Sequence, residues 1–279
     1  MPVFDTPEPI SVTAHVGAGS IRFIASDRLD TVVEVTPGGK RGRDVRAAEQ
    51  TEVAYAGGAL TVRTKERTFI GPTGAVEVTV ELPTGSRIDV NGSWVQVFGE
   101  GGLGEARVKT SVGDVRLDEA GPLRLTVSHG SITVGRAEGG AEITTSSGSL
   151  RVGTVHGPAT LKNSHGSTGV GVVTGDLRVS GANGDIDIER AEGDVVATTA
   201  HGALRVAEVA RGEVQLETSY GAIEIGVREG TAAWLDAGSE RGHVRNTLTA
   251  AEAPERTEDT VKVRARTRYG NIDVRRARH

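Results

Sequence analysis

Three histidines stand at equal intervals in this sequence, each directly before a glycine: His129, His165 and His201 are 36 residues apart. If two stacked β-strand rungs separate them, successive histidines lie roughly 9.6 Å apart. Zinc–nitrogen bonds are only about 2.1 Å long, so one ion cannot join two of these side chains. The chain also has no cysteine. We therefore expect no metal and no cofactor, and interpret the histidines as polar residues at exposed corners.

Asp185 and Asp187 form the second candidate site, because two carboxylates on one strand face can hydrolyse a glycosidic bond. Alternate residues of a strand are roughly 6.7 Å apart, which suits such a pair. However, the sequence places no aromatic platform beside them. It also contains no nucleophile elbow and no nucleotide-binding loop. We expect a protein that is not an enzyme and keep a polysaccharide-active β-helix enzyme as an alternative.

The densest basic segment is VKVRARTRY, near the C-terminus. Strand alternation places four cations of this segment on one face: Lys262, Arg264, Arg266 and Arg268. We interpret these four residues as a partner-binding site for an acidic partner. A second interpretation is protection of a terminal strand, because charge on an edge strand opposes edge-to-edge association. The two interpretations do not exclude each other.

These residues belong to a repeat of about 18 residues that carries two glycines. Glycine at fixed intervals predicts sharp corners, because a positive φ angle costs it little. The first series is Gly113, Gly130, Gly148, Gly166, Gly184, Gly202 and Gly221. The second series is Gly104, Gly121, Gly139, Gly157, Gly175, Gly193, Gly212 and Gly230.

Between the glycines apolar and polar residues alternate, which indicates strands with one buried and one exposed face. Single units cannot bury their apolar face, whereas stacked units can. We therefore predict an all-β fold, a single-stranded parallel β-helix (β-solenoid) of about 18 residues per rung. One apolar column should read Leu125, Ile143, Leu161, Val179, Ala197, Leu216 and Trp234. A polar column of Thr145, Asn163, Thr199 and Thr218 should stabilise the corners.

The repeat also predicts how the chain is organised. Residues 1–91 are expected to form an N-terminal β cap with the leading strands, including a basic loop, GGKRGRDVR. The β-solenoid should cover 92–279. Within it we expect regular rungs over 104–229, a polar excursion over 248–260 and a final rung over 261–276.

Composition narrows the function further. A net charge of −5 makes a broad nucleic-acid surface unexpected. No apolar run reaches the roughly 18 residues of a membrane span, and the first residues lack the pattern of a signal peptide. We therefore expect a cytoplasmic protein without a membrane span.

Several phrases resemble a bacterial β-strand-repeat family of unknown function, often labelled "putative adhesin": PVFDTPEPISV, GSIRFIASDR, VELPTGSRI, NGDIDI and RYGNIDV. The likeness covers nearly the whole chain and is greatest to actinobacterial members. The resemblance implies a right-handed β-helix and supplies no catalytic residues.

Together these observations favour a non-catalytic cytoplasmic scaffold for an unknown protein or glycan partner, acting as a monomer or weak oligomer. The structural alternative is a β-solenoid that self-assembles, with rungs continuing from one molecule to the next into filaments.

Overall fold

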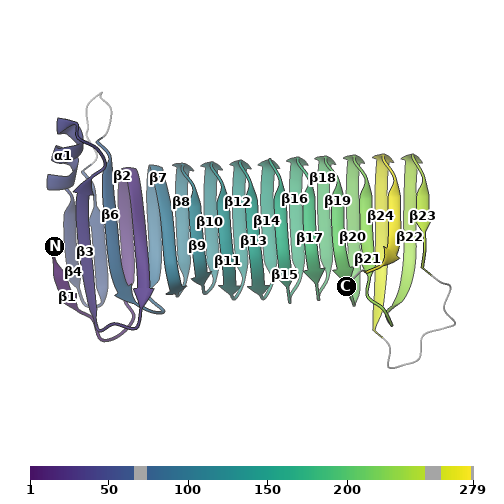
Figure 1. Ribbon diagram of the computed structural model, residues 1–279, viewed down its shortest axis with the longest axis horizontal. Helices are drawn as coiled ribbons and strands as arrows, with labels where there is room; N and C mark the ends of the chain where they lie inside the picture. Colours follow the sequence, from purple (N-terminus) through teal and green to yellow (C-terminus); the bar gives the residue numbers. More distant parts are fainter. Residues whose placement is uncertain (66–73, 249–258, 278–279) are drawn as a thin grey trace. The chain divides into compact units, whose positions relative to one another are not determined.

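The computed structural model describes residues 1–65, 74–248 and 259–277 (Figure 1). The chain divides into two compact units. Unit 1 comprises Met1–Glu138 and Ile143–Thr145, and unit 2 comprises Gly139–Glu142 and Ser146–His279. In the described residues no helix is long and apolar enough to cross a membrane. Most of the expected polar excursion over 248–260 lies outside the described residues.

The strands of unit 1 are β1 (Val3–Asp5), β2 (Ser11–Ser26), β3 (Asp30–Pro37), β4 (Glu52–Ala56), β5 (Ala59–Arg63), β6 (Val76–Pro83), β7 (Arg87–Leu103), β8 (Ala106–Val112), β9 (Val115–Ala120), β10 (Leu123–His129) and β11 (Ile132–Glu138). The next strand, β12 (Ala141–Ser147), has residues in both units.

Unit 1 combines parallel rungs with an N-terminal β cap. The first half of β7 pairs with β8 and the second half with β9, and these ladders continue to β10 and β11. On its other side β7 pairs in parallel with β2. Beyond β2 the sheet turns mixed, because β3 pairs antiparallel with β6, β1 with β3, and β4 with β5. The predicted cap of strands is therefore present.

The expected basic loop is in part a helix, α1 (Gly42–Glu49). Ala47, Ala48 and Glu49 favour helix formation, and the buried Asp44 carboxylate accepts a hydrogen bond of 3.0 Å from the Ala75 amide of the segment before β6. The loop interpretation was wrong because it considered the basic residues and not the helix formers that follow them.

The strands of unit 2 are β13 (Leu150–His156), β14 (Ala159–His165), β15 (Thr168–Val173), β16 (Leu177–Asn183), β17 (Ile186–Ala191), β18 (Val195–His201), β19 (Leu204–Val209), β20 (Gly212–Tyr220), β21 (Ile223–Val227), β22 (Ala232–Arg241), β23 (Val244–Asn246), β24 (Thr260–Tyr269) and β25 (Ile272–Arg276).

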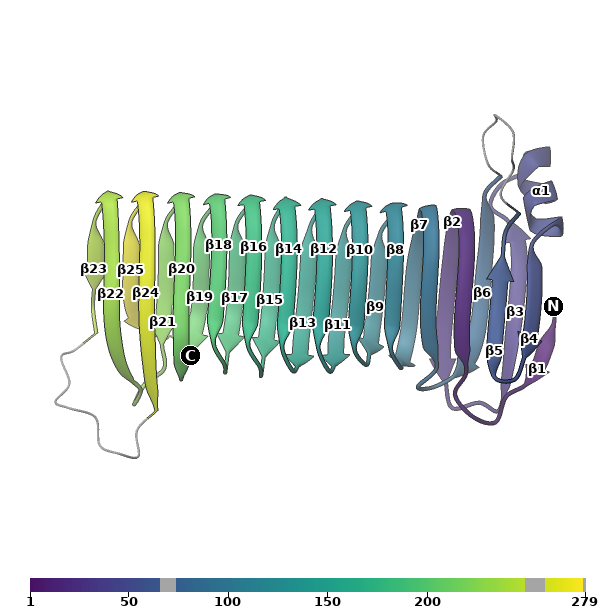
Figure 2. The same cartoon turned by 180° about the vertical axis from the view of Figure 1, so that it is seen from behind.

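Two parallel ladders run through unit 2, and each rung contributes one strand to each ladder. One ladder has the order β14, β16, β18, β20, β24, β22. The other has the order β13, β15, β17, β19, β21, β25, β23. Leu161 pairs with Val179 and Val179 with Ala197, so each rung advances the chain by 18 residues. The fold is the predicted parallel β-helix (Figure 2).

The order of strands departs from the order of the chain at the C-terminal end. Strand β24 pairs with β20 on one edge and with β22 on the other, and both views show it between them (Figure 1, Figure 2). Residues 261–276 are therefore not the final rung, since β22 and β23 lie beyond them. A sequence repeat cannot reveal this insertion, because every rung carries the same alternation.

Trp234 also differs from expectation. It was placed in the buried apolar column, yet it pairs with Lys262 on the outer face and is 54% exposed. Ala237 takes the expected place in this column, because Ala265 pairs with both Leu216 and Ala237. The expected register is thus displaced by three residues, and any odd displacement moves every side chain of a strand to the opposite face.

The corners explain the glycine repeat. At Gly184 (φ +143°) and Gly202 (φ +152°) a Cβ atom would lie 2.1 Å from the carbonyl oxygen of the preceding corner glycine. The polar column completes the corner from inside: Thr218 Oγ1 donates to Gly202 O at 3.0 Å, and Asn163 Nδ2 donates to Gly148 O at 3.0 Å. The predicted corner-stabilising role is confirmed for Asn163 and Thr218, whereas Thr199 Oγ1 is 3.5 Å from Gly184 O and the buried Thr145 Oγ1 has no hydrogen-bond partner among the described residues.

Candidate interaction surfaces

The corner position before the glycine forms a column on the outside of unit 2. His165 pairs with Asn183, and Asn183 with His201, so two of the predicted histidines lie in one column on alternate rungs. His129 takes the equivalent position in unit 1, in register with Val112. In the parts of the chain that the structure describes, no group of three potential metal-binding side chains comes together.

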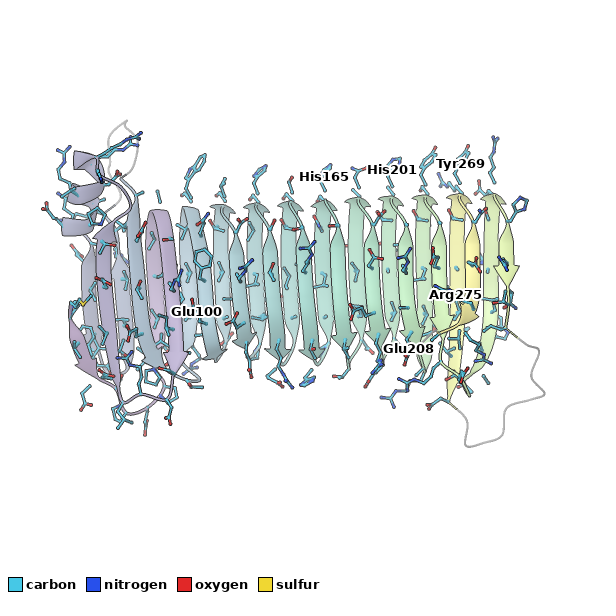
Figure 3. The ribbon with its side chains drawn as sticks, in the orientation of Figure 1. Glu100, His165, His201, Glu208, Tyr269 and Arg275 are labelled. Atoms are coloured by element: carbon cyan, nitrogen blue, oxygen red, sulfur yellow. The ribbon has the colours of Figure 1, made fainter. Side chains whose placement is uncertain are left out.

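The column continues from His201 into a stack of rings that the sequence pattern did not predict. The His201 and Tyr220 ring centroids are 4.9 Å apart with planes at 15°, and those of Tyr220 and Tyr269 are 4.8 Å apart with planes at 3°. Arg241 ends the stack, with Cζ 5.4 Å from the Tyr269 centroid. We call His201, Tyr220, Tyr269 and Arg241 the aromatic column. In Figure 3 His201 and Tyr269 project from the same edge of the strands as His165.

The exposure of aromatic side chains is unusual in this chain. Among the aromatic residues that the structure describes, Phe23 alone is buried, because the core columns consist of small aliphatic residues. The four most exposed aromatic side chains are Trp94 (66%), Trp234 (54%), Tyr220 (49%) and Tyr269 (41%). The sequence did hold a signal for two of them: SYG and RYG repeat the SHG corner phrase with tyrosine in place of histidine.

The predicted basic site lies on the outer face of β24, but neighbouring carboxylates neutralise most of it. Lys262 Nζ is 3.5 Å from Glu213, Arg264 Nε is 3.5 Å from Asp236, and Arg266 Nη2 is 2.6 Å from Asp236. The hydrogen bond from Arg266 is the main cause that lowers the pKa of Asp236. Edge protection is wrong for this strand, because both of its edges are paired.

An open groove of about 420 Å³ adjoins the aromatic column. Two residues of the predicted basic site, Arg266 and Arg268, line it together with Glu217 and Glu240. The groove therefore presents both signs of charge beside the exposed tyrosine rings. Its complete lining is Glu217, Thr218, Ser219, Gly238, Ser239, Glu240, Arg266, Thr267 and Arg268.

The predicted acidic pair serves the fold. Asp185 Oδ1 accepts a hydrogen bond of 2.8 Å from the amide of Ala203 on the next corner. Asp187 lies 3.9 Å from Arg205. The two carboxylates thus have separate structural partners, and they do not face each other across a pocket.

Glu208 is the one glutamate among the buried residues of the described structure, at 8% exposure. Its Oε1 accepts a hydrogen bond of 2.7 Å from Arg228 Nε and lies 3.4 Å from Arg190 Nε. Glu208 stands in register with Arg190 of β17, so its low exposure reflects coverage by the arginine side chains that pair with it. This cluster links neighbouring rungs of unit 2.

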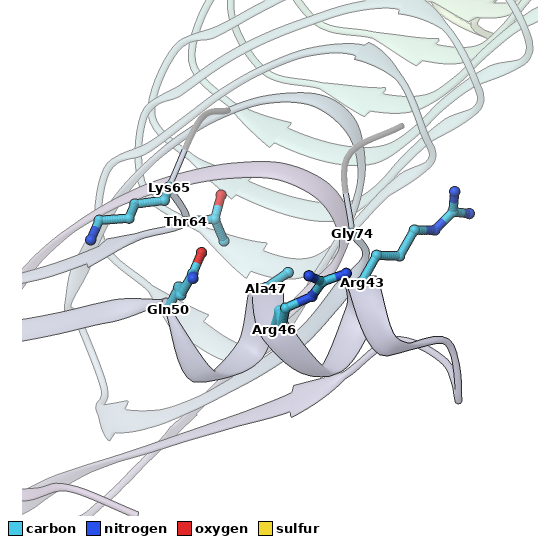
Figure 4. A pocket seen from close by; sticks show the side chains of 7 residues that line it. All are labelled: Arg43, Arg46, Ala47, Gln50, Thr64, Lys65 and Gly74. Atoms are coloured by element: carbon cyan, nitrogen blue, oxygen red, sulfur yellow. The ribbon is translucent and has the colours of Figure 1, made fainter. Parts of the chain in front are cut away.

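Unit 1 has a small pocket of about 120 Å³ beside α1 that contains three basic residues: Arg43, Arg46 and Lys65. Figure 4 shows the Arg43 and Lys65 side chains pointing in opposite directions. Because these two cations diverge, their charges do not combine on one bound anion.

The architecture and the exposed corner columns define a parallel β-helix with ordered surface side chains and no converging catalytic groups among the described residues. Residues 9–277 match the family Toastrack DUF4097, and the chain belongs to this family. A search of curated proteins found no match.

Three solved structures described as "putative adhesin" are similar to this chain. The Bacteroides fragilis NCTC 9343 protein is 12% identical with a TM-score of 0.36, over 98% of this chain and 95% of that one. The Parabacteroides merdae ATCC 43184 protein is 12% identical with a TM-score of 0.37, over 98% and 94%. The Parabacteroides distasonis ATCC 8503 protein is 13% identical with a TM-score of 0.36, over 98% and 95%.

Proposed function

We propose that this protein is a non-catalytic scaffold that binds a protein or glycan partner through the aromatic column and the adjoining groove of unit 2. The observation that carries the proposal is the placement of Tyr220 and Tyr269 on the surface, stacked at 4.8 Å and 49% and 41% exposed. Tyrosine is enriched where proteins bind, because one side chain supplies both apolar area and a hydroxyl group.

Stacking also prepares this surface for binding. Tyr220 lies between His201 and Tyr269, so its ring is ordered before a partner arrives. Immobilising a free side chain on binding costs about 0.5–1.5 kcal/mol, and a ring held by its neighbours avoids most of that cost. The groove alongside offers Arg268 for acidic groups of the partner and Glu217 and Glu240 for basic ones, while Arg266 is held by Asp236.

Of the four residues predicted to bind a partner, Arg266 and Arg268 belong to the proposed surface because they line the groove. Lys262 and Arg264 lie nearer the start of β24 and do not line it. Arg266 is itself paired with Asp236, as Arg264 is, so Arg268 is the main cation that the groove offers to a partner. The cytoplasmic location and the monomeric or weakly oligomeric state accompany the proposal as predictions.

Self-assembly is the second candidate function, and one observation favours it. In the described residues β22 pairs with β24 alone and β23 with β25 alone, and Val244 of β23 is 43% exposed. An unpaired strand edge with exposed apolar side chains can add a further strand. Concentration-dependent sedimentation of the purified chain decides this candidate, because end-to-end assembly predicts species larger than a dimer.

The proposed function is tested by affinity capture from the native cytosol at two salt concentrations. The double variant Tyr220→Ala/Tyr269→Ala is compared with a control, Lys162→Ala/Arg178→Ala, which removes two long exposed side chains from the same ladder away from the corner. Truncating two interface residues of the hot-spot type costs about 2 kcal/mol or more each, so we expect at least a tenfold loss of the captured partner.

The control should retain the partner in full and unfold at the wild-type temperature, and the tyrosine variant should stay folded with a slightly lower unfolding temperature, because it loses the stacked ring contacts. Equal capture by the tyrosine variant would contradict the proposal. Turnover of any member of a polysaccharide panel would replace the scaffold with an enzyme.

A further inference from the structure

Unit 1 has a groove of about 260 Å³ whose chemistry differs from that of the unit 2 groove. Hydroxyl, amide and amino groups dominate its lining, and no carboxylate contributes to it. The side chains that matter here are Asn91, Ser93, Lys109, Ser111, Thr126 and Ser128.

Parallel register arranges these groups in rows. Asn91 of β7 pairs with Lys109 of β8, and Lys109 pairs with Thr126 of β10. Successive members of this row are therefore about 4.8 Å apart. The serines follow two residues later on the same strands, at Ser93, Ser111 and Ser128, and form a second row next to the corner.

Some of the polar groups in the groove are already engaged in the fold. Asn91 Nδ2 donates to Asp89 Oδ1 at 2.9 Å, which leaves its own carbonyl oxygen to accept. Thr64 Oγ1 accepts from the Gly17 amide at 3.0 Å. Lys109 is exposed, and in the described ranges no carboxylate lies within ion-pair distance of it.

An exposed indole stands at the margin of the groove. Trp94 directly follows Ser93 and is 66% exposed. Its neighbours in the corner column are Ala18 and Val112, which are too small to cover both faces of the ring. Tyr220 in unit 2, by contrast, has a ring on each side. The indole of Trp94 therefore keeps an open face with negative electrostatic character.

We propose that this groove binds an acidic saccharide, one whose sugar rings carry a carboxylate. The C–H groups on one face of a sugar ring are weakly positive and pack on an open indole face. Lys109 supplies the single positive charge that a carboxylate requires, and the serine row supplies donors and acceptors for hydroxyl groups. This site goes beyond the unit 2 surface and shares no residue with it.

Two other ligand classes fit the groove less well. A peptide would need apolar pockets for its side chains, and the lining offers Val16 as its one large apolar residue. A nucleic acid would need several cations, whereas Lys109 and His15 are the only basic residues of the groove lining and the chain has a net charge of −5. A single carboxylate on a hydroxyl-rich ligand matches the groups that are present.

The test measures binding of fluorescent oligosaccharides of galacturonate, glucuronate, mannuronate and hyaluronan to the whole chain. Each acidic oligosaccharide is paired with its methyl ester, which keeps the shape and removes the charge. We expect at least one acidic oligosaccharide to bind and its methyl ester to bind at least tenfold more weakly. The Trp94→Ala variant should bind the acidic oligosaccharide with at least tenfold lower affinity than the wild type. Lys109→Gln should remove the preference for the acid over its ester.

The matched control is Trp234→Ala, which removes the other exposed tryptophan and should leave saccharide binding unchanged. Thermal unfolding of each variant confirms that it is folded. The proposal is overturned if no acidic oligosaccharide binds, if the esters bind equally well, or if Trp94→Ala binds like the wild type. It is also overturned if the groove binds an unglycosylated protein in a way that depends on Trp94 and binds no acidic saccharide. Loss or retention of the unit 2 partner has no bearing on these outcomes.

Discussion

Replacing Gly184 with alanine tests whether the corner glycines allow the rungs to stack at their observed distance. Gly184 has a φ angle of +143°, and an added Cβ atom would lie 2.1 Å from the carbonyl oxygen of Gly166. That oxygen belongs to the backbone and cannot rotate away, so the two corners must separate. The hydrogen bonds from Gly166 N to Asn183 O (2.8 Å) and from Thr168 N to Asp185 O (2.9 Å) hold these two corners together.

The expected cost has two parts. A positive φ angle costs an alanine roughly 1–2 kcal/mol. Weakening the two backbone hydrogen bonds adds about 1 kcal/mol for each, which makes a loss of about 3–4 kcal/mol in the free energy of unfolding. Since 1 kcal/mol shifts the midpoint of a domain of 150–250 residues by roughly 2–4 °C, the variant should melt about 10 °C below the wild type.

Gly230→Ala is the matched control, because Gly230 also has a positive φ angle (+76°) but no atom within 4 Å of an added Cβ. It should lose the conformational part alone, about 1–2 kcal/mol. Urea and thermal unfolding followed by far-ultraviolet circular dichroism measure both variants. Equal losses for the two variants would refute the claim that close approach of successive corners requires glycine.

Three further variants test other contacts of unit 2. Leu161→Asp places an unpaired charge where the side chain is fully buried, and we expect a loss of at least about 4 kcal/mol in urea unfolding. Glu208→Ala removes the acceptor of the 2.7 Å bond from Arg228, and the melting temperature should reflect a loss of about 2 kcal/mol. Arg266 lowers the pKa of Asp236 below its ordinary value of 3.8. The ion pair therefore stabilises the folded protein fully above pH 3.8, and this stabilisation is lost as the pH falls through the lower pKa of Asp236 in the folded protein. In Asp236→Asn the free energy of unfolding should fall less steeply over this acidic pH range.

For each of these three predictions, a control variant or an opposite result would contradict the reasoning. Arg178→Asp lies on the exposed face of β16 and should leave stability nearly unchanged, so a loss equal to that of Leu161→Asp would reverse the assigned strand faces. Glu224→Ala removes a half-exposed partner of Arg205 and should cost less than about 1 kcal/mol. If Glu224→Ala lowers the free energy of unfolding as much as Glu208→Ala does, burial does not decide how strongly these ion pairs stabilise the fold. If the free energy of unfolding of Asp236→Asn falls at acidic pH as steeply as that of the wild type, Arg266 does not stabilise the folded state through this carboxylate.

The regular part of the fold could be predicted from the sequence because each rung repeats the same local rules. Glycine marks the corner, alternation marks the strand, and threonine or asparagine bonds the corner from inside, as Thr218 does. A register that advances by 18 residues then brings Leu161 over Val179 without further information. These local rules are sufficient wherever neighbouring rungs are also neighbours in the chain.

The same rules could not predict the C-terminal order of strands. Tyr220, Arg241 and Tyr269 follow one another in the sequence, but Tyr269 lies between the other two in the structure. Which rung pairs with which is a non-local choice, and the alternation of β24 fits any position in the stack. The aromatic column depends on this choice, because chain order would have placed Arg241 against Tyr220 and separated the two tyrosines.

Side-chain footprinting of the partner complex tests the central claim, that the aromatic column is the binding surface, most directly. Hydroxyl radicals oxidise exposed tyrosine, and mass spectrometry measures the rate at each residue with and without the captured partner. The account predicts that the partner slows oxidation of Tyr220 and Tyr269 severalfold and leaves Tyr55 of unit 1 unchanged. Unchanged oxidation of both column tyrosines in the saturated complex would contradict it.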